Sequence, residues 1–135
     1  MGRDITIHLE YRDKKTRKFK YGGSHQVERN YLMFDLFRGL PQYLRNICCR
    51  LRGLPGDITN CTYNSYKDFG NPTYVGWLTT SELKECLDSY KQNFNDEVEE
   101  INVLNDIKSY VVLYDYMNQY ESYGEECRIV FWFDQ

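Results

Sequence analysis

Hydrophobic and polar residues alternate without interruption over residues 4–11. Side chains of a β-strand point alternately to the two faces of its sheet, so this pattern predicts a strand with one apolar and one polar face. The apolar face would hold Ile5, Ile7, Leu9 and Tyr11, and the polar face Asp4, Thr6, His8 and Glu10. This polar face is unusual for a solvated strand, because it carries two carboxylates and one of the chain's two histidines.

The last residues of the chain alternate in the same way. One face would hold Ile129, Phe131 and Phe133, and the other Arg128, Val130, Trp132 and Asp134. We therefore expect the first and last segments to be neighbouring strands of one sheet, with the rest of the chain covering its apolar face.

Two further elements follow the first strand. After a tight turn, alternation over residues 16–21 predicts an edge strand protected by lysines, which Gly22 and Gly23 end. The spacing of apolar residues predicts a helix over 30–38, which Gly39 terminates.

Proline and glycine punctuate residues 40–74, so we interpret this stretch as mostly loop with a short helix near 42–49. Long irregular segments are uncommon in compact domains and often carry function.

Two helices are predicted beyond this central stretch. Thr79 and Glu82 form a capping box that predicts a helix ending near 92–94. A second apolar stripe predicts a helix over 97–119.

These elements predict one α+β domain over residues 1–135. It would contain a small antiparallel sheet that includes both terminal strands, covered on one face by about three helices, with a long central loop.

Composition narrows the class of protein. Aromatic residues make up 16% of the chain, led by 13 Tyr, which suit interfaces and stacking on planar ligands. A net charge of −3 argues against general nucleic-acid binding, which normally needs a basic face. The chain shows neither an apolar run of roughly 18 residues nor the apolar core of a signal peptide. We therefore expect a cytoplasmic protein without a membrane partner.

The five cysteines follow no zinc-binding spacing, and we expect reduced thiols. The sequence contains no P-loop, no G-x-G-x-x-G, no H-E-x-x-H and no G-x-S-x-G. We therefore expect no metal and no cofactor. A nucleophilic Cys48 or Cys49 activated by His25 is an alternative for which no motif positions the residues.

His8 and Glu10 are the first candidates for chemistry. Residues i and i+2 on one strand face lie roughly 7 Å apart, so both can bind one metal ion or flank one substrate if Asp134 or His25 completes the site. In an enzyme, His8, Glu10 and Asp134 would be the catalytic residues. The alternatives are a polar ligand pocket and a hydrogen-bonded polar face that a loop closes.

Arginines and aromatic residues supply the other candidates. Arg29, Arg52 and Arg128 can form an anion clamp, because the guanidinium fork matches phosphate and carboxylate, or they can pair with the chain's 20 acidic residues. An aromatic ring beside arginine and carboxylate is the composition of a nucleotide pocket, and equally of a protein interface. The rings outside the helical stripes are Tyr63, Tyr66, Tyr74, Trp77 and Trp132.

Five short segments occur in a characteristic order along nearly the whole chain. They are Asp4 to Tyr11, Arg29-Asn30-Tyr31, Arg52-Gly53-Leu54-Pro55 with Asp57, Trp77-Leu78-Thr79, and Arg128 to Asp134. In these segments the chain resembles a family of small tailed-phage proteins, which typically open with an Asp-Ile-His-type strand and close with Arg-Ile-Val-Phe-Trp-Phe-Asp. Family members often carry His-Ser-His-Ser before Trp-Leu-Thr, where this chain has Pro72-Thr73-Tyr74-Val75-Gly76. The missing histidines weaken a metal-hydrolase interpretation.

The resemblance implies a counter-defence protein. Small phage proteins of this kind are often counter-defence factors, and some of those sequester nucleotide immune signals, such as cyclic ADP-ribose isomers or cyclic dinucleotides, in pockets between identical subunits. The resemblance therefore implies a homo-oligomer in the cytoplasm of an infected host cell, with a small nucleotide-derived ligand as its partner.

The leading hypothesis is a non-catalytic protein that encloses such a ligand. Phosphate would contact Arg29, Arg52 and Arg128, the base would stack on Tyr74, Trp77 or Trp132, and the hydroxyls would contact Asp4, His8, Glu10 and Asp134. The alternatives are a phosphodiesterase or similar hydrolase that uses His8, and an inhibitor that binds a host protein through a tyrosine-rich surface.

Overall fold

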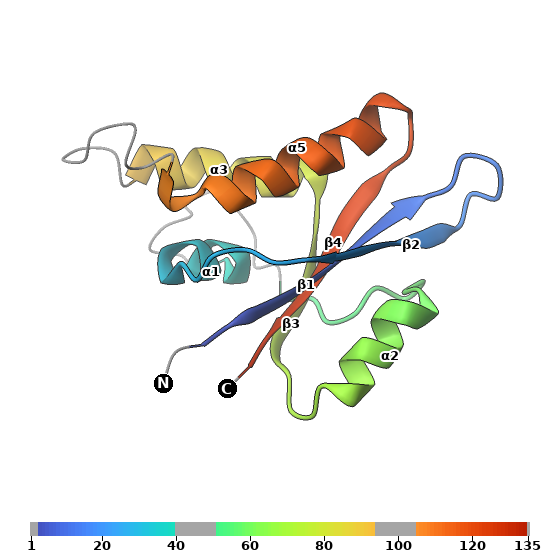
Figure 1. The fold of residues 1–135 in the computed structure, drawn as a ribbon, viewed down its shortest axis with the longest axis horizontal. Helices are drawn as coiled ribbons and strands as arrows, with labels where there is room; N and C mark the ends of the chain where they lie inside the picture. The colour runs from blue at the N-terminus through green and yellow to red at the C-terminus, as the bar shows by residue number, and fades with distance from the viewer. Residues whose placement is uncertain (1–2, 40–50, 94–104, 135) are drawn as a thin grey trace.

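The first and last strands of the chain lie side by side at the centre of one antiparallel sheet. The computed structural model describes residues 3–39, 51–93 and 105–134. The sheet has the order β2-β1-β4-β3 (Figure 1), with β1 at Ile5–Arg12, β2 at Phe19–His25, β3 at Thr73–Thr79 and β4 at Cys127–Phe133. Ile5 of β1 pairs with Phe133 of β4, and the register continues without a shift to Tyr11 and Cys127. The predicted pairing of the two terminal segments is confirmed.

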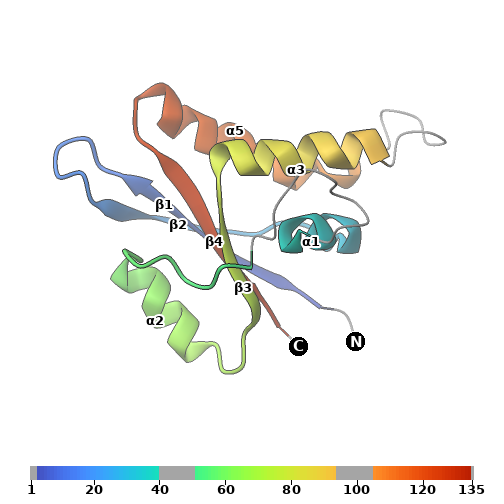
Figure 2. The same cartoon turned by 180° about the vertical axis from the view of Figure 1, so that it is seen from behind.

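Helices cover both faces of this sheet. One side carries α1 (Tyr31–Arg38), α3 (Thr80–Asn93) and α5 (Lys108–Ser122), and the other side carries α2 (Asn60–Asp68) (Figures 1 and 2). The α+β class, the antiparallel sheet with both terminal strands and the three helices over one face are confirmed. The sequence patterns did not predict two elements. One is strand β3, whose residues Thr73 and Tyr74 fall in the stretch interpreted as loop, and the other is α2, which lies within that stretch and covers the polar face.

The sequence of α2 explains why apolar periodicity misses it. Its residues are polar, with little helix propensity and no apolar stripe. Thr59 caps its start, where the Thr59 hydroxyl accepts a hydrogen bond from the Thr62 amide at 3.4 Å. Thr62 is buried, and Ser65, one turn further along, reaches the sheet through a hydrogen bond to His8. The helix therefore packs on the sheet largely through hydroxyl groups.

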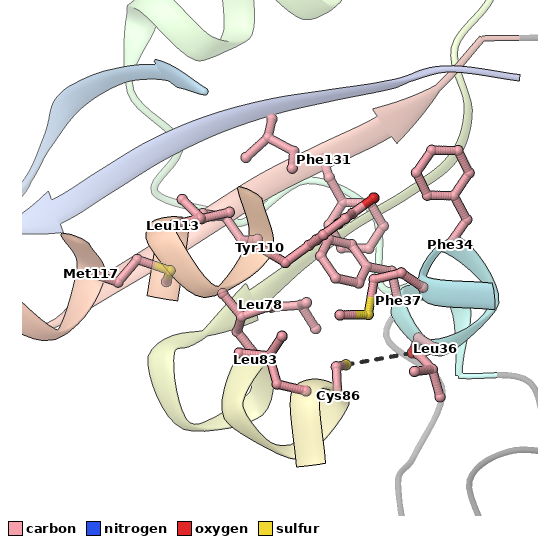
Figure 3. Packing of buried hydrophobic residues seen from close by; sticks show 14 of the residues in the cluster. Phe34, Leu36, Phe37, Leu78, Leu83, Cys86, Tyr110, Leu113, Met117 and Phe131 are labelled. Carbon is pink, nitrogen blue, oxygen red and sulfur yellow. Dashed lines mark hydrogen bonds between the residues drawn. The ribbon is translucent and has the colours of Figure 1, made fainter. Parts of the chain in front are cut away.

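The apolar faces of β1 and β4 pack against α1, α3 and α5 and form the main core. Ile7, Leu9, Ile129, Phe131 and Phe133 are at most 1% exposed, as the alternation predicted. The ring of Phe37 lies 5.3 Å from that of Phe131 and 5.9 Å from that of Tyr110 (Figure 3). Burial of each such side chain stabilises the fold by about 1.5–3 kcal/mol.

Local signals place the ends of α1 and α3 correctly. The Asn30 side chain accepts a hydrogen bond from the Met33 amide, and Gly39 ends α1 with a left-handed φ of 69°. The Thr79 amide donates to the Glu82 carboxylate at 2.9 Å, and the Glu82 amide donates to the Thr79 hydroxyl at 3.3 Å. The predicted capping box is therefore confirmed.

Some predicted boundaries differ from those of the structure, and some predicted segments lie outside the described residues. Strand β2 continues through both glycines, and Gly22 fits because a Cβ there would meet Leu9 Cδ2 at 2.4 Å. Helix α5 begins at Lys108 and ends at Ser122, whereas the prediction was one helix over 97–119. Residues 97–104 of that predicted helix and the short helix near 42–49 fall outside the described residues.

Candidate functional site

The polar face of β1 is buried beneath α2. Glu10 is 0% exposed, and its Oε2 accepts hydrogen bonds from the Thr59 amide at 2.9 Å and from the hydroxyls of Thr59 and Thr62 at 2.6 and 2.8 Å. Its Oε1 accepts hydrogen bonds from Nε and Nη2 of Arg128 at 2.9 and 2.6 Å. Both carboxylate oxygens are therefore occupied, and Glu10 anchors the start of α2 to the sheet.

His8 is enclosed by the same helix. Its Nδ1 lies 2.9 Å from the Tyr21 hydroxyl and its Nε2 lies 2.9 Å from the Ser65 hydroxyl. Burial lowers the pKa of His8 below its ordinary value, although the charge of Glu10 acts in the opposite direction. His8 is thus a neutral imidazole at pH 7 with both ring nitrogens engaged, and neither nitrogen faces a ligand.

The state of His8 predicts a pH dependence of stability. Its pKa in the folded chain lies below the ordinary value of 6.5, so the unfolded chain binds more protons at mildly acid pH. The free energy of unfolding should therefore fall as the pH is lowered through 6.5. His25, whose pKa burial also lowers, should contribute to the same slope. Urea unfolding between about pH 5.5 and 7.5 measures it.

Two variants separate the contributions to this slope. His8→Gln and His25→Gln should each remove one part of the pH dependence, and the double variant should remove both. A His8→Gln protein with the full wild-type slope would show that His8 does not resist protonation in the folded chain.

Asp4, Asp134 and Arg29 lie together at the end of the sheet, away from His8 and Glu10. The Asp4 amide donates to Asp134 Oδ1 at 2.7 Å, and Nε and Nη2 of Arg29 donate to Asp4 Oδ1 at 2.9 and 2.8 Å. The side chains of Arg29 and Asp4 are 46% and 60% exposed. Such a surface ion pair contributes little to stability because water screens it.

Trp132 and Tyr74 occupy two further environments. Trp132 is fully buried, with the ring of His8 at 5.3 Å and the ring of Tyr66 from α2 at 5.5 Å. Within the described chain, its Nε1 has no hydrogen-bond partner. Tyr74 is 37% exposed, and the guanidinium groups of Arg3 and Arg38 lie 4.8 and 3.8 Å from its ring centroid.

Arg52, Trp77 and Arg128 are the predicted site residues that the structure does bring together. They line a cavity of about 450 Å³ between the start of β2, the segment 52–57 and strands β3 and β4. Arg12 and Phe19 also line this cavity, and sequence reasoning did not select them. A signal for Arg12 was available, because position 12 continues the alternation of positions 4, 6, 8 and 10.

Two arginines of this cavity, Arg128 and Arg52, are held in fixed positions. Arg128 is buried, its Nη1 donates to Asp57 Oδ1 at 2.7 Å, and its guanidinium lies 3.5 Å from the Phe19 ring centroid. Nε and Nη2 of Arg52 donate to the Trp77 carbonyl at 3.2 and 2.6 Å, and the guanidinium lies 3.7 Å from the Trp77 ring centroid. Nη2 of Arg52 also donates to Glu82. Among the described residues, Nη1 of Arg52 has no hydrogen-bond partner.

Carboxylates pair with each arginine of this cavity: Glu10 and Asp57 with Arg128, Glu82 with Arg52, and Glu126 with Arg12. Arg12 Nε lies 3.2 Å from Glu126 Oε2 without forming a hydrogen bond, so the two make a loose ion pair. Burial raises the pKa of Asp57, but the hydrogen bond and charge of Arg128 outweigh it and the net shift is downward. The side chains of Asp57 and Glu126 are 61% and 53% exposed, so both can turn into solvent when an anionic ligand competes for the arginines.

Other candidate chemistry finds little geometric basis in the described residues. They include no group of three His, Cys, Asp or Glu side chains that could hold a metal ion. Cys61 is exposed and Cys86 and Cys127 are buried, all as free thiols. Cys48 and Cys49, and with them the Cys–His nucleophile considered above, lie outside the described residues. The helices that the structure describes are too short or too polar to cross a membrane.

Comparison with known proteins does not assign the chain to a family. No family model matches it, and neither the curated proteins nor the solved structures give a significant match. The resemblance to small tailed-phage proteins therefore stays a prediction, and the geometry of the cavity is the basis for the function proposed below.

Proposed function

We propose that this protein binds a small nucleotide-derived ligand, without catalysis, in the cavity lined by Arg12, Arg52 and Arg128. The observation that carries the proposal is the convergence of these guanidinium groups with the rings of Phe19 and Trp77 on one cavity of about 450 Å³. Guanidinium groups match phosphate oxygens in charge and geometry, and aromatic rings stack on bases. Small-molecule sites commonly have volumes of roughly 300–1,000 Å³.

Each arginine has a distinct part in the proposal. Arg128 is tied to buried Glu10 and holds a guanidinium group in a fixed position in the wall of the cavity. Arg52 is oriented by its contacts with Trp77 and Glu82, while its Nη1 bonds to none of the described residues, so it is the residue we expect to contact phosphate. A side chain that is already ordered loses less entropy when the ligand binds. Arg12, in its loose pair with Glu126, can turn toward the ligand.

The proposal does not include hydrolysis, because His8 is bonded at both ring nitrogens beneath α2. The resemblance suggests the biological role, which is sequestration of a nucleotide immune signal by a phage counter-defence protein in the host cytoplasm. A second copy of the chain would close the open side of the cavity, so a homo-oligomer is part of this proposal.

Replacing Arg52 is the sharpest test of the cavity. Arg52→Met keeps the apolar packing on Trp77 but removes the charge, and we expect it to weaken ligand binding about tenfold to a hundredfold. This range corresponds to the roughly 1.5–3 kcal/mol of a hydrogen bond to a charged group. Calorimetric titration with cyclic ADP-ribose, ADP-ribose and a cyclic dinucleotide at constant salt measures the effect. The matched control, Arg29→Met, removes the same charge outside the cavity and should leave affinity unchanged.

The outcomes separate the three classes of function. An equal loss in both arginine variants would show a general charge effect and contradict the assigned cavity. Recovery of intact ligand after heating the complex supports sequestration, whereas time-dependent loss of ligand would indicate a hydrolase. If none of these nucleotides binds and a host protein co-purifies at fixed stoichiometry, the protein is an inhibitor of that partner instead.

A further inference from the structure

The hairpin that joins β1 to β2 is strongly basic, although the chain as a whole is acidic. Residues 12–20 contain six Lys or Arg and one Asp, a net charge of +5, while the chain carries −3. The remaining residues therefore carry −8. The low overall charge, which argues against polyanion binding, is thus an average over two oppositely charged regions. Basic segments of this density are typical of sites that bind phosphate chains.

A second cavity, of about 580 Å³, lies beside this hairpin. On one side it is lined by the basic residues Arg17, Lys18 and Lys20 and the aromatic residues Phe19 and Tyr21. The start of α2 lies opposite. Tyr21 is 36% exposed, so part of its side chain is accessible to a ligand. Phe19 and Asp57 line both this cavity and the one that contains Arg52, so the two cavities are adjacent.

Most cations of the hairpin are available to an anionic ligand. Lys20 lies 3.7 Å from Asp13, but no carboxylate of the described residues pairs with Lys14, Lys15, Arg17 or Lys18. One oxygen of Asp13 is engaged by Thr16, whose amide and hydroxyl donate to it at 2.8 and 3.0 Å. The carboxylate therefore shapes the turn and leaves the positive charge of the hairpin largely unneutralised.

The backbone conformation of Arg17 also supports a role for the positive charge of this hairpin. Its φ is 61°, in the left-handed region that favours glycine or asparagine, and its amide donates to the Asp13 carbonyl at 2.8 Å. Glycine would form this turn with less strain. A long cationic side chain at such a position is consistent with a role for its charge.

We infer that the ligand carries several phosphates in a row and is a short single-stranded oligonucleotide, which runs from the Arg52 cavity past Phe19 onto the hairpin. This inference rests on the proposed function and specifies its ligand class. A mononucleotide engages one cavity, whereas a chain of phosphates engages both. Unpaired bases expose their faces to a ring such as that of Tyr21, which the bases of a duplex do not.

The experiment compares adenosine monophosphate, a thymidine tetranucleotide and a short duplex by calorimetry or fluorescence anisotropy at several salt concentrations. We expect the tetranucleotide to bind at least about tenfold more tightly than either of the others. The double variant Lys18→Gln, Lys20→Gln should weaken tetranucleotide binding and leave the affinity for the monophosphate unchanged. Loss of two phosphate contacts should also lower the slope of log K against log salt by about 1.4.

The variant Arg17→Gly tests whether a loss of tetranucleotide binding could result from misfolding. It should weaken tetranucleotide binding while the unfolding midpoint stays equal or rises, a combination that a damaged fold cannot produce. Equal binding of monophosphate and tetranucleotide, or an unchanged tetranucleotide affinity in Arg17→Gly, would overturn the inference and leave the proposed function standing. Tetranucleotide binding that needs the hairpin but is insensitive to Arg52→Met would overturn the continuous path. Absence of binding to all probes would overturn both proposals.

Discussion

Replacement of Glu10 by alanine is expected to lower the free energy of unfolding by about 3–5 kcal/mol, the usual cost of removing one member of a buried ion pair. The side chains of Arg128 and Glu10 are 5% and 0% exposed, so water cannot solvate the arginine once its partner is lost. Asp57 still contacts Arg128 from the exposed side, but the donors of Thr59 and Thr62 lose their acceptor as well. Chemical denaturation followed by circular dichroism measures the loss.

A double-mutant cycle isolates the ion pair from general packing effects. Glu10→Leu combined with Arg128→Met removes both charges and should be less destabilised than Glu10→Leu alone, because no unpaired charge remains in the interior. Strictly additive losses would show that the two side chains act independently. A loss below about 1 kcal/mol in Glu10→Ala would show that α2 is not held over the sheet by this carboxylate.

The second large effect is expected at Trp132, where replacement by alanine should lower the free energy of unfolding by about 3–5 kcal/mol. The indole is fully buried between the sheet and α2, in contact with the rings of His8, Tyr66 and Phe69. Removing it leaves a cavity that the flanking strand and helix cannot fill without moving. Denaturant unfolding gives the magnitude, and limited proteolysis near residues 59–69 reports whether α2 detaches.

Trp132→Phe is the matched control for this prediction. Phenylalanine keeps most of the ring contacts and removes Nε1, which has no hydrogen-bond partner among the described residues. The removal of an unsatisfied buried donor offsets part of the lost packing, so this variant should be much closer to the wild-type protein. If phenylalanine and alanine were equally destabilising, the cost would come from the indole nitrogen or from the backbone and not from packing under α2.

Both predictions concern α2, a helix that sequence patterns did not reveal. The two central strands were predictable because the alternation of side chains is a property of each strand alone, visible at residues 4–11 and 128–134. The capping box of Thr79 and Glu82 and the terminating Gly39 are equally local. Helix α2 is held instead by hydrogen bonds from the hydroxyls of Thr59 and Thr62 to the Glu10 carboxylate. The partners are separated by 49 and 52 positions in the sequence. No pattern within a window of the chain records such contacts.

The candidate site, like the fold, was predictable from the sequence only in part. Residue chemistry was sufficient to select Arg52, Trp77 and Arg128, since a guanidinium group suits phosphate and an aromatic ring outside the helical stripes suits stacking. It did not show that His8 and Glu10, with equally suggestive chemistry, lie beneath a helix. Arg12 and Phe19 join the cavity through the pairing of β1 with β2 and of β1 with β4.

The sequence by itself determined which faces of the terminal strands are apolar and that these strands belong together, because covalent geometry sets the period of a strand and hydrophobic burial sets its inward face. Only the tertiary structure decided which polar residues are anchors and which line a cavity. That division depends on where α2 and the segment 52–57 pack against the sheet, and burial of a polar group is favourable only where such distant partners complete its hydrogen bonds.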